Sequence, residues 1–70
     1  MNNNFSNIFI SNSICFDDYE ILIKQKHQNG FMAYCPQINQ LVNGDSYDQV
    51  LNNIENIINN HINNLINDMK

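Results

Sequence analysis

The sequence predicts an α+β domain in which an antiparallel sheet of three to four strands packs one face against a single long C-terminal helix. Two observations support this fold class. Apolar and polar residues alternate as far as residue 42, which is the two-residue period of strands. From residue 47 onward the apolar residues recur at three- and four-residue spacing, which is typical of a helix.

The N-terminal part is expected to contribute one strand. Residues 1–6 carry no apolar pattern beyond Phe5 and are predicted to be disordered, whereas residues 7–70 form the single predicted domain. Isoleucine or phenylalanine stands at several even positions of residues 8–16, between mostly polar neighbours, and this alternation predicts a half-buried strand. Asp17 and Asp18 interrupt the pattern and predict a turn.

The middle of the chain predicts a meander of further strands. In residues 19–26 the apolar side chains of Tyr19, Ile21 and Ile23 share one face. Asn29-Gly30 then predicts a tight hairpin, because both residues tolerate positive φ. Residues 31–35 form the predicted returning strand, which ends at a proline, and residues 38–42 form one more short strand before a second reversal at Asn43-Gly44.

The last third of the chain predicts the helix. Ser46 followed by Gln49 matches a capping box, which places the helix start there. The face opposite the apolar stripe consists almost entirely of asparagine, a poor helix former, so burial of the apolar face must supply the stability. The apolar stripe comprises Tyr47, Val50, Leu51, Ile54, Ile57, Ile58, Ile62, Leu65, Ile66 and Met69.

Composition excludes several functional classes. The 70 residues include seven acids and three Lys or Arg, for a net charge of −4, so direct binding to nucleic acid is not expected. No apolar run approaches the length of a membrane span. The acidic balance suits a basic partner. Cys15 and Cys35 are too few for a disulfide framework, and without an export signal they indicate reduced thiols in a cytoplasmic protein.

The residue types that carry chemistry are sparse. Asp17, Asp18 and Glu20 are the only clustered acids, and a solvated turn explains them better than a metal site does. Cys35 could act as a nucleophile with His27 or His61 as base, but a small buried thiol is the favoured interpretation. Lys24, Lys26 and His27 form one basic cluster, interpreted as a solvated strand end. We therefore expect no catalytic, cofactor-binding or metal-binding residues, and no enzyme.

Residues 19–61 combine several motifs in one order: a strand beginning at Tyr19, Gly30-Phe31 at the hairpin, an Ala-Tyr-Cys-Pro-Gln-Ile segment at 33–38, and Gly-Asp-Ser at 44–46. In these motifs the chain resembles the HicB-type antitoxin family. The resemblance implies a partial ribonuclease-H-like fold and a small basic ribonuclease toxin, of the HicA type, as the partner. Family members often carry a C-terminal DNA-binding domain and a fourth strand after the helix. We expect neither in this chain, so operator binding is not carried over, and the predicted strand at 8–16 is expected to take the place of the fourth strand.

Two functional hypotheses therefore stand beside the disfavoured enzyme. The first is an antitoxin-like module that neutralises the toxin by covering its active surface. The second is a stand-alone, self-associating domain without a toxin partner or a DNA-binding half. Uncovered sheet edges favour a homo-oligomer in either case, most simply a dimer. The candidate partner-contact residues are Glu20, Tyr34, Pro36, Gln37, Ile38 and Gln40.

Overall fold

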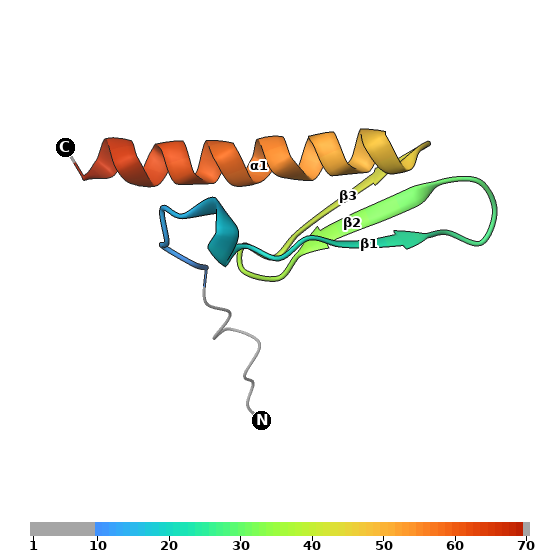
Figure 1. Ribbon diagram of the computed structural model, residues 1–70, viewed down its shortest axis with the longest axis horizontal. Coiled ribbons are helices and arrows are strands. Elements are labelled where there is room, and N and C mark those ends of the chain that lie inside the picture. Colours follow the sequence, from blue (N-terminus) through green and yellow to red (C-terminus); the bar gives the residue numbers. More distant parts are fainter. Residues whose placement is uncertain (1–9, 70) are drawn as a thin grey trace, which may run out of the picture.

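The computed structural model describes residues 10–69 and has two layers, a three-stranded sheet and one long helix across one of its faces (Figure 1). The strands are β1 (Leu22–Gln25), β2 (Phe31–Cys35) and β3 (Gln40–Gly44). A short 3-10 helix, η2 (Phe16–Asp18), precedes them, and α1 (Tyr47–Asp68) follows. The predicted α+β fold class is confirmed. None of the helices in this part of the chain is both long and apolar enough to cross a membrane.

The sheet is an antiparallel meander in the order β1-β2-β3. Leu22 lies opposite Tyr34, which in turn lies opposite Leu41. The predicted first hairpin is confirmed, but its loop is longer than a two-residue Asn-Gly turn. It spans residues 26–30 and is closed by the Lys26 N–H, which donates to the Gly30 carbonyl at 2.9 Å. Only Gly30 has a positive φ there, at 127°, so the glycine is the residue that this loop requires.

The second hairpin turns at residues 36–39. Pro36 follows the last residue of β2, as expected of a residue that cannot donate to a ladder. Asn39 adopts a left-handed conformation with φ of 52°, which asparagine tolerates better than most residues. The turn delays the third strand, which begins at Gln40 rather than at the predicted residue 38.

Asn43-Gly44 does not form the predicted reversal. Both residues belong to β3 and lie opposite Met32 and Phe31. Gly44 is needed for close approach to α1, because a Cβ there would lie 2.6 Å from Gln49 Oε1 and 2.9 Å from Val50 Cγ1. The chain reverses only after this glycine, just before the helix.

The helix starts where the capping pattern predicts. Ser46 is the N-cap, and its hydroxyl accepts a hydrogen bond from the Gln49 N–H at 3.1 Å. The Gln49 side chain in turn accepts from the Asp45 N–H, so both ends of the capping pair satisfy backbone donors. The helix runs for 22 residues. All eight of its asparagines are exposed, as the pattern predicts: Asn52, Asn53, Asn56, Asn59, Asn60, Asn63, Asn64 and Asn67.

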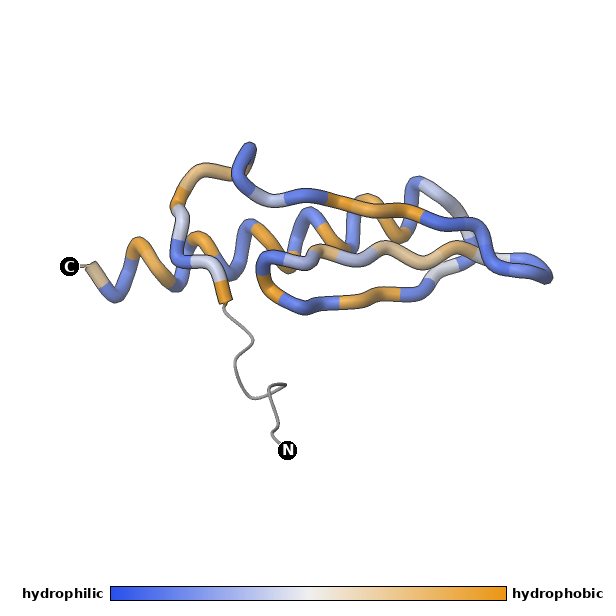
Figure 2. Tube along the Cα trace, turned by 90° about the horizontal axis from the view of Figure 1, so that it is seen from below, coloured by the Kyte–Doolittle hydropathy of each residue, from blue (hydrophilic) through white to orange (hydrophobic). Residues whose placement is uncertain are grey.

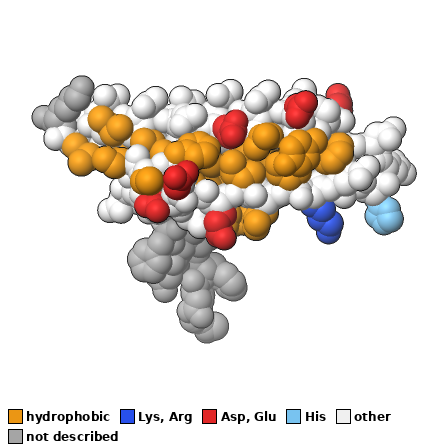
Figure 3. All heavy atoms as spheres, in the orientation of Figure 1, with side chains coloured by type: hydrophobic (Ala, Val, Ile, Leu, Met, Phe, Trp, Pro, Cys, Tyr) orange, Lys and Arg blue, Asp and Glu red, His pale blue; other side chains and the backbone are white. Residues whose placement is uncertain are grey.

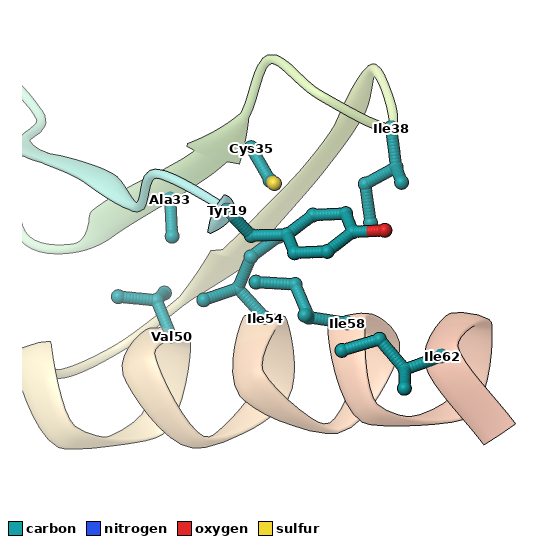
Figure 4. Packing of buried hydrophobic residues seen from close by; sticks show 8 residues of the cluster. All are labelled: Tyr19, Ala33, Cys35, Ile38, Val50, Ile54, Ile58 and Ile62. Atoms are coloured by element: carbon teal, nitrogen blue, oxygen red, sulfur yellow. The ribbon is translucent and has the colours of Figure 1, made fainter. Parts of the chain in front are cut away.

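The core lies between the helix and the inner face of the sheet (Figure 4). The helix contributes one residue per turn from Val50 to Ile62, and β2 contributes Ala33 and Cys35. Figure 2 shows the matching alternation of apolar and polar segments along the helix trace. The buried set is Tyr19, Ala33, Cys35, Ile38, Val50, Ile54, Ile58 and Ile62.

The predicted N-terminal strand is wrong for the residues that the structure describes. Residues 10–15 form no strand, Ile10 and Ile14 are about half exposed, and within residues 10–69 the sheet has three strands and no fourth. Serine hydroxyls explain the difference, because they bond the local backbone and compete with a ladder. The Ser11 hydroxyl accepts from the Ser13 N–H, and the Ser13 hydroxyl accepts from the Cys15 N–H. The terminus predicted to be disordered, residues 1–6, lies outside the described residues.

Candidate protein-binding surface

The sheet face that points away from α1 is a candidate binding surface. We call it the outer sheet face and define it by the residues that alternate with the buried ones. One row of this face crosses all three strands, from Leu22 through Tyr34 to Leu41, because these residues are register partners. Figure 2 looks onto this side of the sheet. The outer sheet face comprises Leu22, Lys24, Met32, Tyr34, Leu41 and Asn43.

The row from Leu22 to Leu41 is apolar, and both of its leucines are exposed to solvent. Leu22 is 54% exposed and Leu41 is 49% exposed. Among residues 10–69, no helix or strand lies over this face (Figure 1). A contiguous exposed apolar patch on a small domain typically marks an interaction site.

A polar cluster at one end of the sheet joins the face to the preceding segment. The Gln37 amide donates to Glu20 Oε1 at 2.9 Å, and its own oxygen accepts the Glu20 N–H at 2.8 Å. The Gln37 carbonyl also accepts the Ser11 N–H at 2.7 Å. The Tyr34 hydroxyl donates to Asn39 Oδ1 at 2.9 Å, which fixes the ring beside the turn. These bonds hold the rim of the surface in one conformation.

Five of the six predicted contact residues have accessible side chains at this end of the sheet. Glu20 and Gln40 are exposed, and Tyr34, Pro36 and Gln37 are half-buried. Gln40 alternates with Leu41 and lines a depression together with residues of α1, so it lies on the helix side of the sheet and not on the outer sheet face. Ile38 is only 4% exposed and its side chain belongs to the core, so it offers a partner no surface.

Leu22 and Leu41 are absent from the predicted contact residues, although they dominate the exposed apolar row. The strand alternation places both on the face opposite the core. Pairing them with Tyr34 would have required the strand register, which depends on the unforeseen lengths of the two hairpin loops.

His61 has a structural role. Its Nε2 lies 2.6 Å from the Ser11 carbonyl, and its ring meets the edge of Tyr19 with centroids 5.9 Å apart. The Tyr19 hydroxyl donates to the Ser13 carbonyl at 2.6 Å. Together these contacts tie the segment before η2 to the helix. The Cys35 thiol is buried and bonds Gln37 Oε1 at 3.6 Å, rather than a histidine that could activate it.

The clustered acids have ordinary partners. Asp18 accepts a hydrogen bond from the Ser13 hydroxyl, and Glu20 is engaged by Gln37. Within residues 10–69, no three histidine, cysteine or acidic side chains converge in a way that could hold a metal ion.

The basic cluster lies at the opposite end of the sheet. Lys24, Lys26 and His27 line a shallow, open depression at the first hairpin together with Met32. Lys26 Nζ donates to Asn43 Oδ1 at 3.0 Å across the sheet. Glu20, two residues before β1, and Lys24, the third residue of β1, thus place an acidic and a basic side chain four residues apart along this edge.

No protein-family model, curated protein or solved structure matches this chain. A functional assignment therefore depends on the surface itself and on the residue pattern at 19–61. The resemblance of that pattern to the HicB-type family stays a prediction.

Proposed function

We propose that this chain is a protein-binding module of the antitoxin type, which neutralises a small basic ribonuclease by covering its active surface. The observation that carries the proposal is the open apolar row on the outer sheet face, formed by Leu22, Tyr34 and Leu41. Burial of such a row by a partner removes apolar surface from water, which lowers the free energy of the complex.

Two further features support the proposal. The order of strand, strand, strand and helix agrees with the fold that the resemblance implies, and the partial ribonuclease-H-like topology is part of what we propose. The net charge of −4 favours encounter with a basic protein, because opposite charges raise the association rate.

In the proposed mechanism the chain acts by occlusion. The apolar row packs on the toxin and excludes water from its centre, while the polar rim supplies directed hydrogen bonds. Tyr34 suits the centre of such an interface, since it offers a large ring at low entropic cost. Glu20 and Gln37 present a pre-formed polar pair beside it. RNA is kept from the toxin's active surface, and no chemistry by this chain is required.

Co-expression tests the proposal. The chain is expressed with the product of the neighbouring open reading frame, selected as a small basic protein, and growth rescue and co-purification are measured. Leu41→Ser is expected to weaken the complex about tenfold or more, because it removes apolar area at the row. Met69→Ser is the matched control, since Met69 is 71% exposed but lies at the end of α1.

Two outcomes would contradict the proposal. One is a basic neighbour that neither co-purifies nor is neutralised, which would favour the stand-alone, self-associating domain. The other is equal weakening by both serine variants, which would move the contact away from the outer sheet face.

A further inference from the structure

The outer edge of β1 is a second candidate contact site, separate from the outer sheet face. β1 is a terminal strand, and among residues 10–69 no other strand pairs with its outer edge. The Lys26 N–H donates to the Gly30 carbonyl, so the alternation of an antiparallel ladder directs the backbone groups of Lys24 and Leu22 toward β2. The N–H and C=O groups of Ile21 and Ile23 therefore point to the open edge, where they can accept another strand.

We propose that two copies of this chain pair antiparallel along the outer edge of β1, with Leu22 opposite Leu22 of the second copy. In a two-fold pair centred on Leu22, Glu20 of each copy lies opposite Lys24 of the other. Opposite charges in directly facing positions stabilise a pair of strands, and like charges destabilise it. The symmetry makes this contact twice.

Neighbouring registers are less complementary. A pair centred on Ile23 places Leu22 opposite Lys24, and a pair centred on Lys24 places the two lysines against each other. Only the Leu22 centre combines an apolar contact at the axis with opposite charges on both sides. This register is also compatible with the backbone hydrogen bonds. Leu22 directs its N–H and C=O groups toward β2, so at the new edge Ile21 of each copy can exchange hydrogen bonds with Ile23 of the other.

Both sheet faces favour this pairing. On the outer side, the rows from Leu41 to Leu22 of the two copies join into one apolar row across six strands. On the inner side, α1 packs mainly on β2 and β3 and least on β1, and Ile21 and Ile23 stay half-buried. Figure 3 views the molecule from the β1 side and shows apolar side chains gathered between the helix and the sheet. The second copy covers this opening with the same residues.

Among residues 10–69, β3 forms the other unpaired edge of the sheet, and it has no charge pattern of this kind. β3 has the sequence Gln-Leu-Val-Asn-Gly, with no charged residue to select a register. The pairing uses the backbone edge of β1, whereas the proposed antitoxin role uses the outer sheet face, although Leu22 and Glu20 belong to both. The tests below measure self-association without a toxin, so their failure is distinguishable from failure of the toxin-binding experiment.

A charge swap tests the register. Sedimentation of the full-length chain is expected to show a dimer whose dissociation constant rises about tenfold or more in Glu20→Lys and in Lys24→Glu, because each variant faces like charges twice. The double variant, with both charges exchanged, is expected to return to within about threefold of the starting value. Circular dichroism confirms that each variant is folded. A monomeric starting protein, or a double variant as weak as the singles, would overturn the proposal.

Crosslinking gives a second readout. In a Cys15→Ser background, Leu22→Cys is expected to form a disulfide-linked dimer on mild oxidation, since facing residues of this type lie about 4.5 Å apart at Cα. Leu41→Cys is the control, because Leu41 is similarly exposed but belongs to β3. Crosslinking through Leu41→Cys and not through Leu22→Cys would refute the β1 pairing.

Discussion

The two outward surfaces of this domain, one on the helix and one on the sheet, differ in the side chains they present to solvent. The outer face of α1 carries eight exposed asparagines. The outer sheet face carries Leu22, Tyr34 and Leu41 in one row, with the two leucines about half exposed. Both surfaces lie on the same small domain and share one core.

The asparagine face of α1 is suited to solvent, whereas the outer sheet face exposes apolar side chains that a partner could cover. Asparagine costs the helix stability but keeps its outer face polar, so that face needs no cover. The sheet could equally have carried polar residues at its outward positions, since only the inner face builds the core. Its apolar row is therefore not required by the core, which is consistent with the binding role that we propose.

The largest expected effect sets the scale for a buried position. Ile54→Ala removes a fully buried side chain between helix and sheet and is expected to cost about 2–5 kcal/mol. That is comparable with the whole stability of a small domain, so the variant should lose cooperative urea unfolding at 25 °C. Ile66→Ala on the same helix is the control, because Ile66 is 37% exposed. Equal losses in the two variants would contradict the position of the core.

The next effect concerns the contact between β3 and α1. Gly44→Ala places a methyl group within 2.9 Å of Val50 and is expected to cost about 1–3 kcal/mol, measured by urea denaturation. Asn43→Ala, one residue earlier on the outer sheet face, should change stability by less than about 0.5 kcal/mol. A tolerated alanine at position 44 would mean that helix and sheet are less closely packed than described.

These contacts also show how far the sequence predicts the fold. The capping pair Ser46 and Gln49 placed the helix start correctly, and Pro36 correctly marked the end of β2, because both act through their immediate neighbours. Over its described residues, 10–16, the predicted N-terminal strand is wrong, because hydroxyl bonds of Ser11 and Ser13 satisfy the backbone locally. The reversal predicted at Asn43-Gly44 failed because the glycine serves a contact with α1 that is distant in sequence.

The candidate surface was predicted in part for the same reason. Tyr34 and Gln37 belong to the recognisable segment at 33–38, Glu20 belongs to the predicted strand at 19–26, and the structure brings all three to one end of the sheet. Leu22 and Leu41 join that surface only through the strand register, which hairpin lengths determine. Ile38 belongs to the core because the turn at 36–39 directs its side chain inward.

A smaller effect tests the helix side of the comparison. Asn59→Ala and Asn63→Ala replace exposed asparagines with the best helix former and are expected to raise stability by about 0.5 kcal/mol each. Thermal unfolding followed by circular dichroism measures the gain. A loss of stability in either variant would show that the asparagine makes contacts that matter, and that its face is not merely solvated.

The smallest effect on stability tests the sheet side. Leu22→Thr keeps a residue suited to strands at an exposed position, so we expect the free energy of unfolding of the monomer to change by less than about 0.5 kcal/mol. Self-association should nevertheless weaken, because Leu22 lies at the proposed two-fold axis. Unchanged association with unchanged stability would remove the distinction between the two outward surfaces.

The asparagine face of α1 also has a consequence during synthesis. Helix formation by this segment depends on the sheet, because its own propensity is poor. The three strands precede it in the chain, and its 22 residues take on the order of seconds to translate. Until this segment packs, the inner face of the meander stays uncovered, so this face is the apolar surface that a folding intermediate would expose to other proteins.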